Sequence, residues 1–167
     1  LGGRDFAIAH GGSLEHRMAL SEPRVFEPVG STDTELVFCE LLNRAFAQGQ
    51  KSLADVGAEQ LQRWLDELND HGSLSLVITD GRDLCAYADK HGRGELFLLE
   101  LLPPYERLSL RDDDLALDLT RRGTVSRKGV VVASNPLSVD AGAGEAARTF
   151  GRLAPGELVV ARQGSLR

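Results

Sequence analysis

The hydrophobic period of this chain changes at Gly72 from a helical to a strand-like spacing. Residues 36–46 place apolar side chains three and four positions apart, which puts them on one face of an α-helix. A second run has the same spacing, with apolar positions at Leu61, Trp64, Leu65 and Leu68. After Gly72, apolar residues occupy alternate positions in 73–78, which predicts a strand. Helices first and strands afterwards are typical of an α+β fold with antiparallel sheet.

The first helix has the clearest start signal in the chain. Thr32 can accept a hydrogen bond from the backbone N–H of Glu35, and the Glu35 side chain can reach back, which makes a capping box. Gly49 is the expected stop of this helix, and Gly72 that of the second.

The strand signals are short and separated by turn residues. An apolar run at 6–9 ends at Gly11 and Gly12, and Asp80-Gly81 predicts a hairpin between 73–78 and 84–88. The segment 13–30 is polar and predicts a loop. Further strands are expected at 96–99, 115–119, 130–133 and 156–161. No repeat or linker divides the chain, so residues 1–167 are expected to form a single domain.

Charge and cysteine content exclude several classes of protein. The formal net charge of -6 argues against nucleic acid and anionic membranes as partners. The longest apolar stretch, 96–102, is interrupted by Glu100 and is too short to span a bilayer. Cys39 and Cys85 lack the spacing of metal ligands, so no metal or cofactor is expected. Two cysteines are also too few for a disulfide scaffold, and we expect a reducing, cytoplasmic location.

Two places hold residues that can carry chemistry. His10 is followed by Gly11 and Gly12 at the end of a predicted strand, where exposed backbone N–H groups suit an oxyanion hole. Asp33 lies in the first turn of a helix, where a carboxylate is stabilised and can bind a ligand ammonium group. Taken singly, the residue types favour a glycine turn with a surface histidine and an ordinary helix start.

Taken in order, several segments resemble the class II glutamine amidotransferases. Residues 1–12 resemble the family's strand and loop, with Ala-His-Gly-Gly where the family usually has Ala-His-Asn-Gly. The other similar segments are Gly-Ser-Thr-Asp-Thr-Glu at 30–35, Ile-Thr-Asp-Gly at 78–81, Val-Val-Ala-Ser-Asn-Pro-Leu at 131–137 and Pro-Gly-Glu-Leu at 155–158. The resemblance extends to about residue 162 and is to the compact, stand-alone type of amidotransferase.

The resemblance implies a fold and a reaction. The fold is that of the Ntn hydrolases, a four-layer αββα sandwich with antiparallel sheets, of which this chain is the C-terminal two-thirds and lacks the first strands. In the family an N-terminal cysteine attacks the side-chain amide of glutamine, ammonia leaves, and water hydrolyses the thioester. The matching residues here are Gly11 and Gly12 at the oxyanion hole, with Gly11 in place of the asparagine. Asp33, with His10, matches the substrate-binding positions.

Two departures from the family pattern leave alternatives open. Gly11 lacks the amide donor of asparagine, and the family's nucleophilic cysteine and early arginine precede the position of Leu1. Cys39 and Cys85 lie in apolar contexts and cannot replace that cysteine, so we expect this chain alone to be inactive. The alternatives are a related γ-glutamyl amide hydrolase and a degenerate Ntn-fold domain kept for binding or assembly. Expected partners are glutamine or a γ-glutamyl amide and, through exposed strand edges, a second copy in a homodimer.

Overall fold

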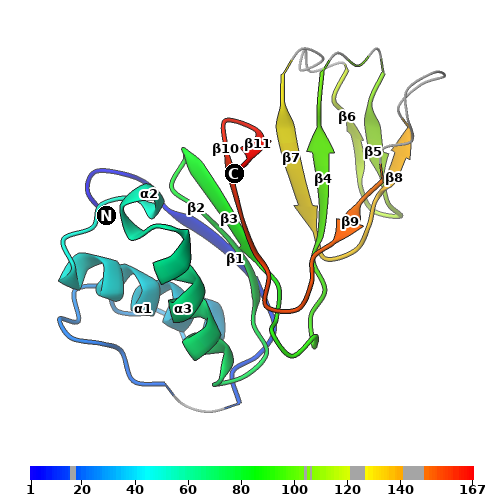
Figure 1. Ribbon diagram of the computed structural model, residues 1–167. Helices are drawn as coiled ribbons and strands as arrows, with labels where there is room; N and C mark the ends of the chain where they lie inside the picture. Colours follow the sequence, from blue (N-terminus) through cyan, green and yellow to red (C-terminus); the bar gives the residue numbers. More distant parts are fainter. Residues whose placement is uncertain (16–17, 104, 106, 121–126, 141–148) are drawn as a thin grey trace.

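In the part of the chain that the structure describes, three helices cover one face of a five-stranded antiparallel sheet (Figure 1). The structure, a computed structural model, describes residues 1–167 except 16–17, 104, 106, 121–126 and 141–148. The helices are α1 (Asp33–Ala47), α2 (Leu53–Val56) and α3 (Ala58–Asn69). The sheet has the order β1-β2-β3-β10-β11, formed by Ala7–Gly11, Ser75–Thr79, Asp83–Tyr87, Leu158–Arg162 and Ser165–Leu166. β1 ends this order, so one of its edges pairs with no described strand.

Two smaller antiparallel sheets lie beyond the other face of the five-stranded sheet (Figure 1). The first has the order β7-β4-β9, formed by Gly129–Ala133, Phe97–Leu101 and Gly151–Arg152. The second has the order β6-β5-β8, formed by Ala116–Asp118, Ser109–Arg111 and Ser138–Asp140. The α+β class and the antiparallel sheets predicted from the sequence are confirmed. Among the described elements, the sheet β6-β5-β8 packs on the far side of β7-β4-β9.

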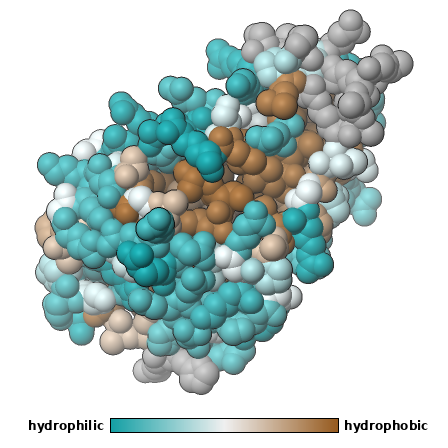
Figure 2. All heavy atoms as spheres, viewed as in Figure 1, coloured by the Kyte–Doolittle hydropathy of each residue, from teal (hydrophilic) through white to brown (hydrophobic). Residues whose placement is uncertain are grey.

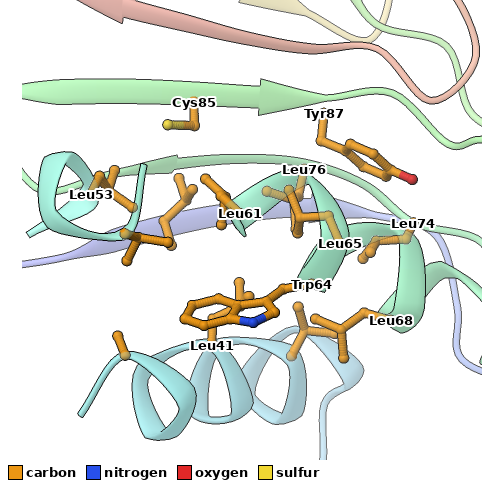
Figure 3. Packing of buried hydrophobic residues seen from close by; sticks show 14 residues of the cluster. Leu41, Leu53, Leu61, Trp64, Leu65, Leu68, Leu74, Leu76, Cys85 and Tyr87 are labelled. Carbon is orange, nitrogen blue, oxygen red and sulfur yellow. The ribbon is translucent and has the colours of Figure 1, made fainter. Parts of the chain in front are cut away.

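Among the described residues, three hydrophobic clusters hold these layers together. The largest lies between the helices and the five-stranded sheet and contains Trp64, Leu65 and Tyr87 (Figure 3). Ala86 and Leu96 belong to the cluster between that sheet and β7-β4-β9. The third cluster, which includes Leu110, packs β4 and β7 against β5 and β8. Successive residues of β3 therefore face opposite layers, as the two-residue period of a strand requires.

The start of α1 has the predicted cap contacts and one further contact, with Gly30. Thr32 is the N-cap, and its Oγ1 accepts the N–H of Glu35 at 3.3 Å, as expected. The Glu35 carboxylate reaches back, as predicted, and accepts hydrogen bonds from the Thr32 hydroxyl at 3.3 Å and from the backbone N–H of Gly30 at 3.1 Å. A Cβ at Gly30 would lie 2.5 Å from Glu35 Oε2, so the glycine allows the carboxylate to reach this far. The helix ends as predicted, with Gly49 at φ 69° just beyond its C-cap.

The predicted loop at 13–30 is fastened to α1 by two buried polar side chains. Asn43 accepts the N–H groups of Val25 and Phe26 and donates to the Phe26 carbonyl. Glu40 accepts both the N–H and the hydroxyl of Ser21, at 2.7 and 2.6 Å. The described part of this segment therefore follows a fixed path across α1 without a helix or strand of its own.

Removal of the Asn43 amide is expected to loosen this segment. The substitution Asn43→Ala leaves two backbone N–H groups and one carbonyl without their partner, so we expect the free energy of unfolding to fall by about 2 kcal/mol. Denaturant unfolding measures this change, and limited proteolysis should show faster cleavage within 18–30. Arg63→Ala, at an exposed position of α3, is the control. Equal stability and equal cleavage of the two variants would show that Asn43 does not hold the segment.

Candidate functional site

Glycine occupies positions 11 and 12, at the end of β1, for different structural reasons. Gly12 has φ 136°, and a Cβ there would lie 2.2 Å from the carbonyl oxygen of Ser73. Only glycine fits at this position. Gly11 has no such restriction, because no atom lies within 4 Å of an added Cβ and its φ is outside the left-handed region. Gly12 is therefore required by the backbone, whereas Gly11 leaves open space beside the turn.

The turn after Gly12 packs on the segment that leads into β2. Ser73 donates its N–H to the carbonyl of Ser13 at 2.9 Å, and Glu15 donates its N–H to the carbonyl of His71 at 2.8 Å. Gly72 is needed here, because a Cβ would lie 2.2 Å from the Ser13 carbonyl oxygen. The glycine predicted only to stop a helix thus also permits this close approach of two chain segments.

His10 links β1 to α1 and to the start of β2. Its Nε2 lies 3.4 Å from the Ser73 carbonyl oxygen, and its Nδ1 lies 3.3 Å from Thr34 Oγ1. Since a carbonyl only accepts, Nε2 carries the hydrogen, and in the neutral ring Nδ1 accepts from the Thr34 hydroxyl. The half-buried imidazole is therefore held in one orientation beside Gly11.

Asp33 binds the segment that follows the glycine pair. Its Oδ2 accepts the Leu14 N–H at 2.9 Å and the Ser13 hydroxyl at 3.2 Å. Ser13 in turn donates its N–H to Ser73 Oγ at 3.0 Å. The structure thus links His10 to Asp33 through Ser73 and Ser13, and Gly11 and Gly12 lie in the chain between them, next to His10.

A pocket of about 480 Å³ opens beside this network. It is lined by residues of β1, β2 and β7 and by the two segments next to β4 and β7: Ala9, His10, Gly11, Ser75, Leu76, Val77, Gly94, Glu95, Leu96, Val132, Ala133, Ser134 and Asn135. His10 and Gly11 line the pocket, but Gly12 and Asp33 lie outside its lining. Figure 2 shows apolar residues gathered in the hollow between the helical side and the smaller sheets. The pocket therefore has an apolar interior with a few polar groups at its wall, as is usual for ligand sites.

The sequence analysis assigned no role to Glu95 or Asn135, which both line the pocket. Glu95 lines the pocket and forms an ion pair with Arg152 at 2.7 Å. Asn135 belongs to the segment that resembles the family but had no assigned role. Glu95 lies in a Gly-Arg-Gly-Glu stretch without a recognisable motif, so no local signal could have found it.

Both cysteines are buried away from this pocket. Cys39 is 8% exposed and Cys85 is 2% exposed. Burial raises the pKa of both thiols, that of Cys85 to about 12, and nearby carboxylates add to the effect. A thiol with so high a pKa is a poor nucleophile at neutral pH. The interpretation of Cys39 and Cys85 as small buried apolar residues is therefore confirmed.

Comparison with known proteins identifies the family. The family model for "Glutamine amidotransferases class-II" matches residues 1–167. The chain belongs to the class II glutamine amidotransferases. The resemblance predicted from the sequence is thereby confirmed. A crystal structure of a predicted glutamine amidotransferase from Pseudomonas aeruginosa PA01 superposes with a TM-score of 0.75 and 27% identity, over 99% of this chain and 61% of that one.

Other relatives of this amidotransferase chain are longer than it is. An uncharacterized protein of Methanocaldococcus jannaschii is 36% identical over 138 residues, which are 81% of this chain and 38% of that protein. The YafJ protein of Escherichia coli, provisionally named a glutamine amidotransferase, is 28% identical over 159 residues, 94% of this chain and 58% of that protein. The chain thus spans less than two thirds of the length of each of these relatives.

Two further observations concern membrane-spanning helices and metal-binding groups. No helix in the described ranges is both long and apolar enough to cross a bilayer. The described histidine, cysteine and carboxylate side chains form no group of three or more that is arranged to hold a metal ion.

Proposed function

We propose that this chain forms the substrate-binding part of a glutaminase-type site, in which glutamine or a γ-glutamyl amide occupies the pocket beside His10 and Gly11. The observation that carries the proposal is the link from His10 through Ser73 and Ser13 to Asp33, at the glycine turn that follows β1 and next to a pocket of about 480 Å³, in a chain of this family. An N-terminal cysteine from outside residues 1–167 supplies the nucleophile, because both cysteines in the chain are buried.

The proposed reaction proceeds through a thioester. The cysteine thiolate attacks the amide carbon, and the carbonyl oxygen takes up the negative charge at the position of Gly11 and Gly12. The α-amino group of that cysteine takes the thiol proton and passes it to the nitrogen. The carbon–nitrogen bond then breaks, ammonia leaves, and a γ-glutamyl thioester remains. Water hydrolyses the thioester and releases glutamate and the thiol.

The geometry of Asp33 supports its role in binding the substrate α-ammonium group. Among the described residues, its hydrogen bonds end at Oδ2, on Ser13 and Leu14. Oδ1 is therefore available for a ligand, while Oδ2 holds the turn beside the pocket. A carboxylate fixed in this way offers a charge-assisted hydrogen bond to an ammonium group without further ordering of its side chain.

Loss of the Asp33 charge is expected to weaken substrate binding in the full-length protein. Asparagine at position 33 still accepts from Leu14 but lacks the charge, so Asp33→Asn should raise KM for glutamine by about 10- to 100-fold, the range of one charged hydrogen bond. Glutamate release measured against substrate concentration tests this. The control is Glu35→Gln, a neighbouring carboxylate that contacts Gly30.

The alternative, a degenerate Ntn-fold domain for binding or assembly, is favoured by one observation, the absence of an amide side chain at Gly11. Intact mass and N-terminal sequencing of the mature protein, followed by the same assay, separate the two functions. A free N-terminal cysteine with glutamate release supports the enzyme. A different N-terminal residue contradicts the catalytic proposal, and so does the absence of glutamate release from glutamine and from γ-glutamyl amides. Either result supports the binding domain.

A further inference from the structure

A second pocket lies on the helical face of the five-stranded sheet. It has a volume of about 350 Å³ and opens between the α2–α3 connection and strands β3 and β10. Leu53, Leu61 and Cys85 line its inner part, and Figure 3 shows these three side chains near the same end of the helix–sheet layer. Val77 and Val132 of the first pocket belong to the cluster on the opposite face of the sheet. The second pocket is therefore separate from the candidate substrate site.

Two of the residues that line this second pocket, Asp83 and Arg162, form an ion pair. Asp83 is 3% exposed and lies opposite Arg162 in the β3–β10 register. The Nε and Nη2 atoms of Arg162 each donate to one oxygen of the Asp83 carboxylate. This pairing neutralises both groups, because the two planar ends meet as a bidentate pair.

Arg167 is the second cation that lines the pocket. Its backbone N–H donates to the Val160 carbonyl at 3.0 Å, which fixes this residue beside β10. Within the described part of the chain, no carboxylate pairs with the Arg167 guanidinium. Among the described residues, the exposed Arg167 guanidinium therefore has no carboxylate partner at the pocket wall.

The interior of the pocket is apolar. Leu53, Leu61 and Cys85 are each less than a tenth exposed, and Val160 completes this side. The Cys85 thiol stays neutral near pH 7, because burial raises its pKa to about 12. A volume of 350 Å³ lies near the lower end of the range for small-molecule sites, about 300–1,000 Å³.

We propose that this second pocket binds a small amphipathic carboxylate, with the anionic group on Arg167 and a short aliphatic body against Leu53, Leu61 and Val160. The apolar wall favours the body through burial of its surface. The unpaired guanidinium favours a single anionic head and disfavours a cationic one. Such a ligand leaves the Asp83–Arg162 pair intact.

A titration with hexanoate in the full-length protein tests the proposal. Backbone ¹H–¹⁵N spectra should show saturable shifts at the pocket residues Ala54, Gly57 and Ala58. Hexanol, with the same body but no charge, should bind more weakly, and hexylamine should leave these signals unchanged. Arg167→Gln should raise the Kd of hexanoate about tenfold, as expected for the loss of one charge-assisted hydrogen bond.

The matched control is Arg63→Gln, which removes an exposed arginine of α3 outside the pocket lining. This variant should bind hexanoate like the unmodified protein. Arg167→Gln removes no described ion pair, so its spectrum should otherwise match that of the unmodified protein. The same Kd for both variants, or hexanoate shifts that spare Ala54, Gly57 and Ala58, would overturn the proposal. Neither result depends on glutaminase activity, so the test is independent of the function proposed above.

Discussion

In the full-length protein, Gly11→Asn is expected to raise kcat for ammonia release from glutamine by about 10²–10³-fold, the usual effect of one oxyanion-hole donor. The family usually has asparagine at this position, and the resemblance implies that its side-chain amide donates to the oxyanion. The backbone here does not require glycine, because an added Cβ at Gly11 meets no atom within 4 Å. The new amide can therefore enter the pocket that Gly11 already lines.

The matched control for this gain is Gly11→Ala. Alanine adds the same Cβ without a donor, so kcat should stay near that of the unmodified protein. Steady-state kinetics with glutamine separate the two results, since a donor that acts only in the transition state changes kcat and leaves KM nearly constant. Equal rates for the asparagine and alanine variants would contradict the assignment of Gly11 to the oxyanion hole.

Asp89→Ala should have the largest effect on stability, a loss of about 3–5 kcal/mol in the free energy of unfolding. The Asp89 side chain is fully buried and accepts hydrogen bonds from Leu74 N–H and Asn69 Nδ2, both at 2.8 Å. It also accepts the N–H groups of His91 and Arg93, at 2.8 and 3.1 Å. Truncation leaves these donors unpaired at the junction of α3, β2 and the segment before Glu95.

The pH dependence of stability offers a second test of Asp89. Burial alone would raise the pKa of this carboxyl, but hydrogen bonds from Leu74, Asn69, Arg93 and His91 outweigh it and hold the pKa below the ordinary value of 3.8. The group therefore adds stability above about pH 4, and this contribution is lost as pH falls through the lower, folded-state pKa. Asp89→Ala should flatten the acid limb of a denaturant-unfolding series.

The control for Asp89 is Asp70→Ala. Asp70 is exposed and pairs with Lys90 at the surface, where ion pairs contribute little. Its removal should leave both the unfolding free energy and the acid limb almost unchanged. An Asp89 variant that behaves like the Asp70 variant would show that the buried network does not hold the junction.

Local chemistry explains which elements the sequence predicted correctly. Thr32 and Gly49 fix the ends of α1, and the Asp80-Gly81 turn joins β2 to β3 with Gly81 at φ 81°. These signals lie within a few residues of the structure they specify. The sequence also predicted that the Glu35 side chain reaches back to the helix start, but not that it binds Gly30, because the close approach of Gly30 depends on the path of the preceding segment.

The elements missed by the sequence are short and depend on distant partners. β5, β8, β9, β11 and α2 have between two and four residues each, too few to show a hydrophobic period. β5, for example, forms between β6 and β8, which follow it in the sequence. Dependence on distant partners also explains which residues of the site the sequence predicted. His10, Gly11 and Asp33 stand in short motifs, whereas Glu95 reaches the pocket through a segment held by Asp89.

The distribution of aromatic side chains makes the two ends of the molecule optically distinct. Trp64 is the only indole in these 167 residues and lies in the cluster beneath the helices. Tyr105 lies in the cluster between the smaller sheets. Tryptophan fluorescence from this chain therefore follows the helical layer, and far-ultraviolet dichroism follows all layers together. Coincident unfolding curves by the two probes would indicate one cooperative unit, and separate curves would indicate that the smaller sheets melt on their own.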